Sequence, residues 1–144
     1  LIEMMLPSAV DDSLAPPGHH IANLFVQYAP YALADGDWDA ERPRLLERCL
    51  SRIDAHAPGF SDSVLHSQVL APPDLEARFG LTGGNIFHGA MTPSQLFNLR
   101  PVPGWSDYRT PVRGLYLCGA GAHPGGGVSG MPGYNAAGEV LRRR

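Results

Sequence analysis

The chain has 144 residues, of which 44% are hydrophobic and 17% charged, and its formal net charge is −3. These values are typical of a globular protein, and they exclude a disordered chain and a basic surface for nucleic acid. No apolar run approaches the roughly 18 residues of a membrane-spanning helix, and a peripheral membrane contact stays open.

Two segments of alternating apolar and mixed residues open the chain. Residues 1–9 and 20–28 each repeat with the period of a strand that buries one face. Between them stand the turn-forming segments Asp11-Asp12-Ser13 and Pro16-Pro17-Gly18. The sequence therefore predicts an antiparallel pair of strands.

A helix is expected next, with Asp39 as its N-cap and an end near His56, before Pro58-Gly59. Its apolar residues recur at helical spacing, and they are Leu45, Leu46, Cys49, Leu50 and Ile53. Its arginines are interpreted as a solvated face, and they are Arg42, Arg44, Arg48 and Arg52.

Residues 63–70 are predicted to form a third strand. Pro72-Pro73 then opens a short helix, 74–79, which Gly80 ends. The segment 81–111 is long and irregular, and loops of this length are usually functional.

The C-terminal segment predicts a buried strand at 115–118, a glycine-rich turn, and a helix from about Ser129. Helix N-termini present free N–H groups and favour negative charge, so the turn suits an electron-rich ligand. The two cysteines, Cys49 and Cys118, fall on expected buried elements, which is typical of reduced thiols in an intracellular protein. The histidines show no metal-ligand spacing, so no metal is expected.

Several ligands compete for this turn. A phosphate loop requires a lysine, and the chain has none. A dinucleotide fingerprint requires glycine where Pro124 stands, and only 20 residues follow Pro124, too few for another helix and strand. A flavin site and a plain glycine-rich turn without a ligand both stay open.

Specific motifs in the second half of the chain resemble a known family. They are Leu-Tyr-Leu-Cys-Gly-Ala-Gly at 115–121, His-Pro-Gly-Gly-Gly-Val-Ser-Gly-Met at 123–131 and Asn-Ala-Ala at 135–137, preceded by matches at 84–90, 95–97 and 100–101. Together they resemble the C-terminal flavin motif of the FAD-dependent phytoene desaturase/amine oxidase superfamily. Within it they are most like the branch of pyridine nucleotide-disulfide oxidoreductase domain protein 2. Ala122 and Gly126 depart from the loop of phytoene desaturases proper, which affects the substrate more than the cofactor.

The resemblance implies an α+β or α/β C-terminal fragment of a two-domain FAD-dependent oxidoreductase. Residues 1–100 would be part of the substrate domain, with its antiparallel sheet and helices. Residues 101–144 would supply the last strand and helix of the Rossmann-like FAD-binding domain. The N-terminal FAD-binding part of the same protein would then be missing, and this fragment alone would be inactive.

The resemblance also assigns roles to residues in the turn. Gly119, Ala120 and Gly121 would lie near the ribityl–pyrophosphate part of FAD. Backbone N–H groups farther along would face the pyrimidine edge of the flavin ring, from Gly127, Val128, Ser129, Gly130 and Met131. Three residues of the long loop are candidates for substrate contacts: His88, Gln95 and Arg100. His88 can also act as a base, bind the flavin or only hold loop backbone, and Arg100 can also pair with a buried aspartate.

The function implied is removal of a hydride from a C–H or C–N bond of an apolar or amphipathic substrate, with no catalytic residue assigned within this chain. Hydride transfer mainly needs positioning and a dry site. Two alternatives stay open: a non-enzymatic binding or scaffold protein that keeps the flavin fold, and a stand-alone nucleotide-binding domain. A cytoplasmic location is expected, and the sequence indicates no oligomeric state.

Overall fold

The structure is a computed structural model in which residues 1–142 are described. Two compact units make up the chain, Leu1–Asp74 and Leu75–Arg144. The expected domain division after residue 100 stays a prediction, and the last two arginines of that expected domain lie outside the described residues.

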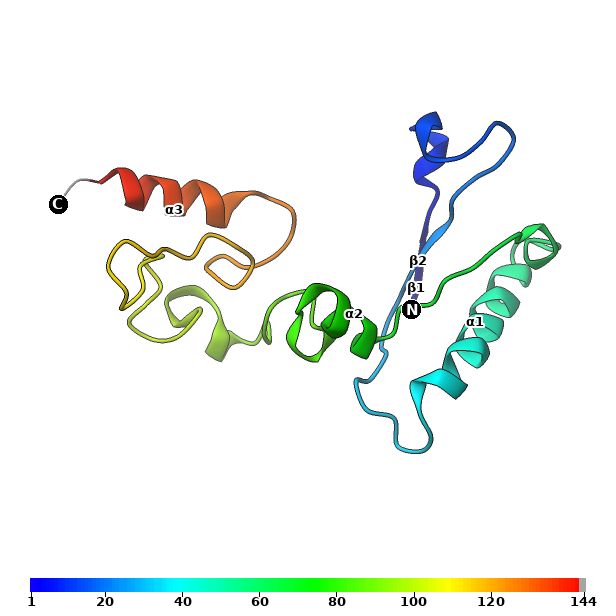
Figure 1. Ribbon diagram of the computed structural model, residues 1–144, viewed down its shortest axis with the longest axis horizontal. Coiled ribbons are helices and arrows are strands. Elements are labelled where there is room, and N and C mark those ends of the chain that lie inside the picture. The colour runs from blue at the N-terminus through cyan, green and yellow to red at the C-terminus, as the bar shows by residue number, and fades with distance from the viewer. Residues whose placement is uncertain (143–144) are drawn as a thin grey trace. The chain divides into compact units, whose positions relative to one another are not determined.

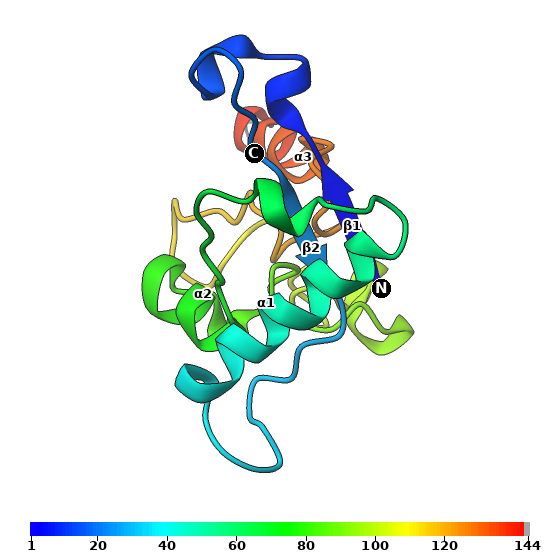
Figure 2. The same ribbon diagram turned by 90° about the vertical axis from the view of Figure 1, so that its right-hand side faces the viewer.

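The first unit begins with a two-stranded antiparallel sheet, as the sequence predicts. Strands β1 (Ile2–Met5) and β2 (Asn23–Val26) lie side by side in both views (Figure 1, Figure 2). Ile2 pairs with Val26 and Met4 with Leu24, so these apolar side chains share one face. Both strands are shorter than expected. Strand β1 ends early because η1 (Pro7–Ala9) begins shortly after it, and η2 (Asp12–Leu14) follows in the same connection.

Helix α1 (Trp38–Asp54) confirms the central helix, with one difference at its start. The N-cap is Asp37, whose carboxylate accepts a hydrogen bond from the Ala40 backbone N–H at 2.9 Å. Asp39 lies in the first turn instead. Two aspartates so close in sequence both fit the cap pattern, and only the backbone conformation at Asp37 distinguishes them.

The predicted strand at 63–70 is wrong. After η3 (Ser61–Ser63) the backbone is extended, but no described segment pairs with it. A strand requires a hydrogen-bonded neighbour as well as a suitable sequence, and Leu65 in this segment is exposed. Helix α2 (Pro72–Phe79) follows as predicted, and its first turn includes the two prolines.

The second unit contains short 3₁₀ turns and one α-helix. The turns are η4 (Thr82–Gly84), η5 (Pro93–Gln95) and η6 (Phe97–Leu99), and the helix is α3 (Met131–Leu141). The predicted strand at 115–118 is wrong, since it forms only an isolated antiparallel bridge between Arg109 and Tyr116. Cys118 is exposed as a result, whereas Cys49 is buried as predicted.

The described residues thus form an α+β structure with three α-helices and one small sheet. Few apolar side chains are buried, and among the described residues they are Trp38, Cys49, Ala71, Ala122, Pro132 and Ala136. Within residues 1–142, no helix has both the length and the apolar content needed to cross a membrane.

Candidate functional site

The glycine-rich turn before α3 presents open main chain. Gly127 has φ +138° and Gly130, the N-cap of α3, has φ +69°, conformations that side chains with a Cβ rarely adopt. A Cβ placed on either glycine would meet no heavy atom within 4 Å. Val128 between them is fully exposed and also has a positive φ, of 56°. The backbone of this stretch is therefore accessible to a ligand.

The N–H groups of this turn also lack acceptors. Within the described part of the chain, the backbone N–H groups from Gly126 to Gly130 find no hydrogen-bond acceptor. Met131 at the start of α3 donates to Ser129 Oγ at 3.3 Å. Free donors at a helix start are the arrangement that binds negative or electron-rich groups.

The earlier part of the turn is folded tightly on itself. Ala122 N donates to Gly119 O at 3.0 Å, and Gly125 N donates to Ala122 O at 2.8 Å. Ala122 and Gly125 are buried, and a Cβ on Gly125 would lie 3.0 Å from Cε of Met91. The residues predicted to bind the cofactor, 119–121 and 127–131, thus flank a compact bend.

Arg100 connects the long loop to this bend. Its guanidinium donates to Ala120 O from Nη2 at 2.7 Å and from Nε at 3.1 Å. Nη2 also donates to Phe87 O at 2.5 Å. Longer contacts of 3.5 Å reach the carbonyl oxygens of His88, Ala90 and Gln95. Arg100 therefore brings the backbone of His88 and Gln95 toward Ala120.

The structure decides between some of the roles that the sequence allowed for Arg100, but not between those allowed for His88 and Gln95. No described aspartate pairs with Arg100, whose partners are all main-chain oxygens. The side chains of His88 and Gln95 are exposed and, within residues 1–142, make no side-chain hydrogen bond. Their role in substrate binding stays a prediction.

Tyr108 and Asn135 hold α3 beside the turn, and the sequence did not single them out as a pair. The Tyr108 hydroxyl donates to His123 O at 3.0 Å and accepts from Asn135 Nδ2 at 2.8 Å. His123 Nδ1 is buried and has no partner among the described residues. Asn135 belongs to the matched Asn-Ala-Ala motif, which is the one sequence signal for this contact.

A second link joins α3 to the bridge at Arg109. Arg109 Nε donates to Glu139 Oε1 at 2.6 Å, and Arg109 also lies over the Tyr116 ring, 5.5 Å from its centroid. The hydrogen bond with Glu139 is the main reason that the pKa of Arg109 is raised. Glu139 is buried, so this ion pair stabilises α3 against the segment that precedes the turn.

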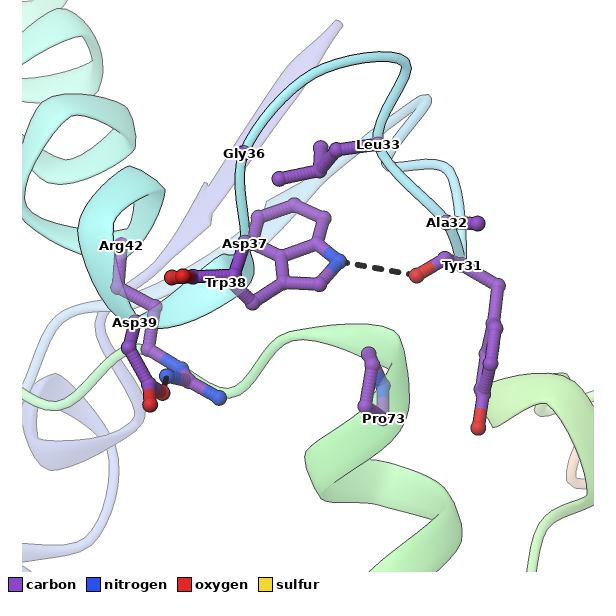
Figure 3. Close-up of a pocket in the computed structure, with 9 residues that line it drawn as sticks. All are labelled: Tyr31, Ala32, Leu33, Gly36, Asp37, Trp38, Asp39, Arg42 and Pro73. Atoms are coloured by element: carbon purple, nitrogen blue, oxygen red, sulfur yellow. Dashed lines mark hydrogen bonds and ion pairs between the residues drawn. The ribbon is translucent and has the colours of Figure 1, made fainter.

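A separate cavity of about 390 Å³ lies at the start of α1 (Figure 3). It is lined by Tyr31, Ala32, Leu33, Gly36, Asp37, Trp38, Asp39, Arg42 and Pro73. The indole of Trp38 crosses the cavity and its Nε1 donates to Tyr31 O at 3.0 Å.

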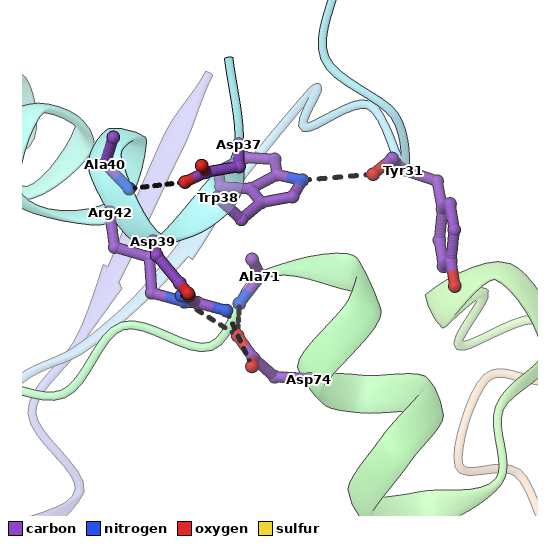
Figure 4. A network of polar contacts seen from close by, with 8 residues as sticks. All are labelled: Tyr31, Asp37, Trp38, Asp39, Ala40, Arg42, Ala71 and Asp74. Carbon is purple, nitrogen blue, oxygen red and sulfur yellow. Dashed lines mark hydrogen bonds and ion pairs between the residues drawn. The ribbon is translucent and has the colours of Figure 1, made fainter.

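Beside this cavity, Arg42 forms ion pairs with two aspartates (Figure 4). Arg42 forms a fork with Asp74, with Nη2–Oδ1 at 2.8 Å and Nε–Oδ2 at 3.0 Å, and it also pairs with Asp39. These bonds, that with Asp74 first, raise the pKa of Arg42. Asp74 Oδ2 accepts from Ala71 N at 2.7 Å. The interpretation of Arg42 as part of a solvated face is therefore wrong, because its side chain is 24% exposed and ties α1 to the start of α2.

The sequence of the chain is similar to those of proteins that are named as oxidoreductases. "Pyridine nucleotide-disulfide oxidoreductase domain-containing protein 2" of Mus musculus and of Rattus norvegicus is 56% identical over 99% of this chain and 25% of the relative. One of the subunits of a limonene dehydrogenase of Castellaniella defragrans is 31% identical over 92% of the chain and 25% of the relative. "Phytoene desaturase (lycopene-forming)" of Pantoea ananas is 29% identical over 88% of the chain and 25% of the relative.

The chain is thus similar, along nearly its whole length, to proteins named as oxidoreductases, dehydrogenases and desaturases. Within this class it resembles pyridine nucleotide-disulfide oxidoreductase domain-containing protein 2 and, more distantly, phytoene desaturases, which confirms the resemblance stated from the motifs. The chain spans about a quarter of the length of these relatives. No protein-family model and no solved structure matches it.

Proposed function

We propose that this chain is part of a two-domain FAD-dependent oxidoreductase that takes a hydride from a C–H or C–N bond of an apolar or amphipathic substrate. The observation that carries the proposal is the open main chain at 127–131, in a segment that resembles a flavin motif. Support comes from the 56% identity with a relative named as an oxidoreductase. Two further relatives are named for limonene and for phytoene, which favours an apolar substrate.

The residues of the turn fit a flavin in two respects. Gly127 and Gly130 carry no side chain that would occupy the space beside the backbone. Among residues 1–142, the N–H groups from Gly126 to Gly130 have no acceptor, and that of Met131 makes only a 3.3 Å hydrogen bond to Ser129 Oγ. In the proposal, the N–H groups of 127–131 hold the pyrimidine edge of the ring and residues 119–121 lie near the ribityl–pyrophosphate part. When bound, the flavin would supply the hydride-accepting chemistry.

Arg100 and Tyr108 hold the backbone of the glycine-rich turn in place. Arg100 fixes Ala120 against the loop at 87–95, and Tyr108 fixes His123 against α3. We assign residues 1–100 to the substrate domain and 101–144 to the FAD-binding domain of the complete protein. The resemblance supports this division, which differs from the boundary between the two compact units at Asp74 and Leu75.

The experiment that tests the proposal is purification of the complete gene product that contains residues 1–144. We expect the absorbance spectrum of bound flavin, and loss of that absorbance when an apolar substrate is added without an electron acceptor. Flavin without any substrate-dependent bleaching would favour the scaffold alternative. Binding of ATP or NAD in place of FAD would favour a stand-alone nucleotide-binding domain.

A variant of the turn tests the assigned contact. Gly127→Val adds a β-branched side chain at φ +138° and in the open space beside the backbone, so we expect the complete protein to retain less flavin. The matched control is Gly126→Ala, whose added methyl would make ordinary contacts of 3.6 Å with Ala120 and Phe87. Equal flavin content in the Gly127→Val variant and the unaltered protein would contradict the contact.

A further inference from the structure

Arg100 is a buried cation that has no carboxylate partner among residues 1–142. Its residue exposure is 2%, and its hydrogen bonds go to the carbonyl oxygens of Phe87, Ala120 and three other residues. Arg109 and Arg142, which also belong to the second unit, are both paired with Glu139. Within the described residues, no aspartate or glutamate lies in ion-pair distance of Arg100.

The electrostatic effect of the buried Arg100 charge extends farther than that of an exposed charge. Carbonyl dipoles lower the cost of burying a guanidinium, but they leave its net charge in place. Water and salt screen exposed charges, whereas a buried charge is screened much less. A negative charge that develops nearby is therefore stabilised by Arg100 more than by an exposed arginine.

The charge lies at the bend that carries the proposed flavin residues. Nε is 3.1 Å from the oxygen of Ala120 and 3.6 Å from the position that a Cβ on Gly125 would occupy. Transfer of a hydride to a flavin brings two electrons and one proton, which adds one negative charge to the bound group. In the proposal, the pyrimidine edge of the flavin, where this negative charge would increase, lies against residues 127–131. The guanidinium contacts the bend that comes just before that segment.

We infer that Arg100 raises the reduction potential of the flavin bound at this turn, by favouring its negatively charged reduced form. This inference rests on the proposed function. Arg100 acts as a positioning residue, because its N–H groups are directed at the main chain and it acts on the ligand through its charge and through Ala120.

The test is the reduction potential of the complete flavoprotein, measured by equilibration with a redox dye and read from the flavin absorbance. Arg100→Gln removes the charge, and we expect the ratio of reduced to oxidised flavin at a fixed potential to fall at least tenfold, which is about 30 mV for a two-electron couple. Arg100→Lys keeps the charge and loses the planar fork. We expect its ratio to stay within about threefold of the unaltered protein.

Arg113→Gln is the matched control, because it removes the same charge from an exposed side chain. We expect its ratio to stay within about threefold as well. An Arg100→Gln protein that keeps its flavin and shows an unchanged potential overturns the inference and leaves the proposed function standing.

Two other outcomes are also decisive. If Arg100→Gln does not fold or does not keep flavin, Arg100→Met, which also removes the charge, is measured in its place: a fall of at least tenfold in the ratio supports the inference, and an unchanged ratio overturns it. Absence of flavin from the unaltered complete protein refutes the proposed function itself, and the inference with it.

Discussion

At the scale of single residues, Tyr108 joins two parts of the second unit. Its hydroxyl binds the carbonyl oxygen of His123 just before the glycines and the amide of Asn135 in α3. Both contacts are partly buried, so each partner would lose a bond that solvent replaces only in part. The Tyr108 hydroxyl therefore helps to orient α3 beside the turn, together with the ion pair between Arg109 and Glu139.

We expect Tyr108→Phe to lower the free energy of unfolding by about 1–3 kcal/mol, because it leaves the His123 carbonyl and the Asn135 amide without this partner. Urea denaturation followed by circular dichroism measures the change. Tyr134→Phe is the control, since Tyr134 is exposed on the same helix and its change should stay within about 0.5 kcal/mol. Equal stability of the two variants would refute the structural role of Tyr108.

Individual site residues were predictable to different degrees. The open glycines could be located from sequence, because glycine is the residue that positive φ and close ligand approach require. The partners of Arg100 could not, since any residue can offer a carbonyl oxygen and a sequence pattern does not mark which one does. The pairing of Arg42 with Asp74 was missed for a similar reason, because the two residues are 32 positions apart.

At the scale of secondary structure, local signals were sufficient for helices and insufficient for strands. All three α-helices were expected from periodicity, caps and prolines, and their bounds differ from expectation by a few residues. Of the expected strands, β1 and β2 formed because each is the hydrogen-bonded neighbour of the other. The segments at 63–70 and 115–118 have apolar sequences, but within the described chain they lack a strand partner beyond one bridge.

Loss of the α1 cap is the first prediction at this scale. Asp37→Ala removes the carboxylate that binds the N–H of Ala40, and we expect a decrease of about 1 kcal/mol in the free energy of unfolding. Asp35→Ala removes a nearby exposed carboxylate that caps no helix. Urea denaturation should show a clear loss for Asp37→Ala alone, and equal losses would argue against Asp37 as the cap.

The end of α1 provides a prediction about pH. The hydroxyl and the N–H of Ser61 donate to Asp54, and they lower the pKa of that carboxyl group below its ordinary value. A group with a lowered folded pKa stabilises the fold above its ordinary pKa of about 3.9, and this stabilisation is lost as pH falls through the folded value. Ser61→Ala should therefore reduce stability at about pH 6 and have less effect at about pH 2.5.

Denaturation at several pH values compares Ser61→Ala with the unaltered chain. Ser63→Ala is the control, because the Ser63 hydroxyl donates to the carbonyl oxygen of Phe60 and not to a carboxylate. Its effect should not depend on pH. A difference between Ser61→Ala and the unaltered chain that is constant down to about pH 2.5 would show that Asp54 is not the partner that matters.

At the scale of the whole molecule, the chain leaves much of its surface uncovered. Its accessible surface is 10596 Å². Two separate compact proteins, each of half this length, would expose only about 8,700 Å² in all. Within the described residues, no large side chain is completely buried, and many large apolar side chains are exposed. The chain spans about a quarter of the length of the relatives named above.

We expect the 144-residue chain alone to bind FAD weakly, because in the proposal the N-terminal part of the protein supplies the rest of the site. Equilibrium dialysis against FAD measures this, with the complete gene product as the control. Tight binding of one FAD per isolated chain would contradict the proposed division of the site. The cytoplasmic location stays a prediction, to be checked by cell fractionation.

The two tryptophans lie one in each compact unit, Trp38 in the first and Trp105 in the second. Trp38 is shielded from water and donates to Tyr31 O, whereas Trp105 is 38% exposed. Indole fluorescence shifts to longer wavelength in contact with water, so the two emitters are distinguishable. Trp38→Phe and Trp105→Phe each leave a single emitter, and the melting of each half of the chain can then be followed on its own.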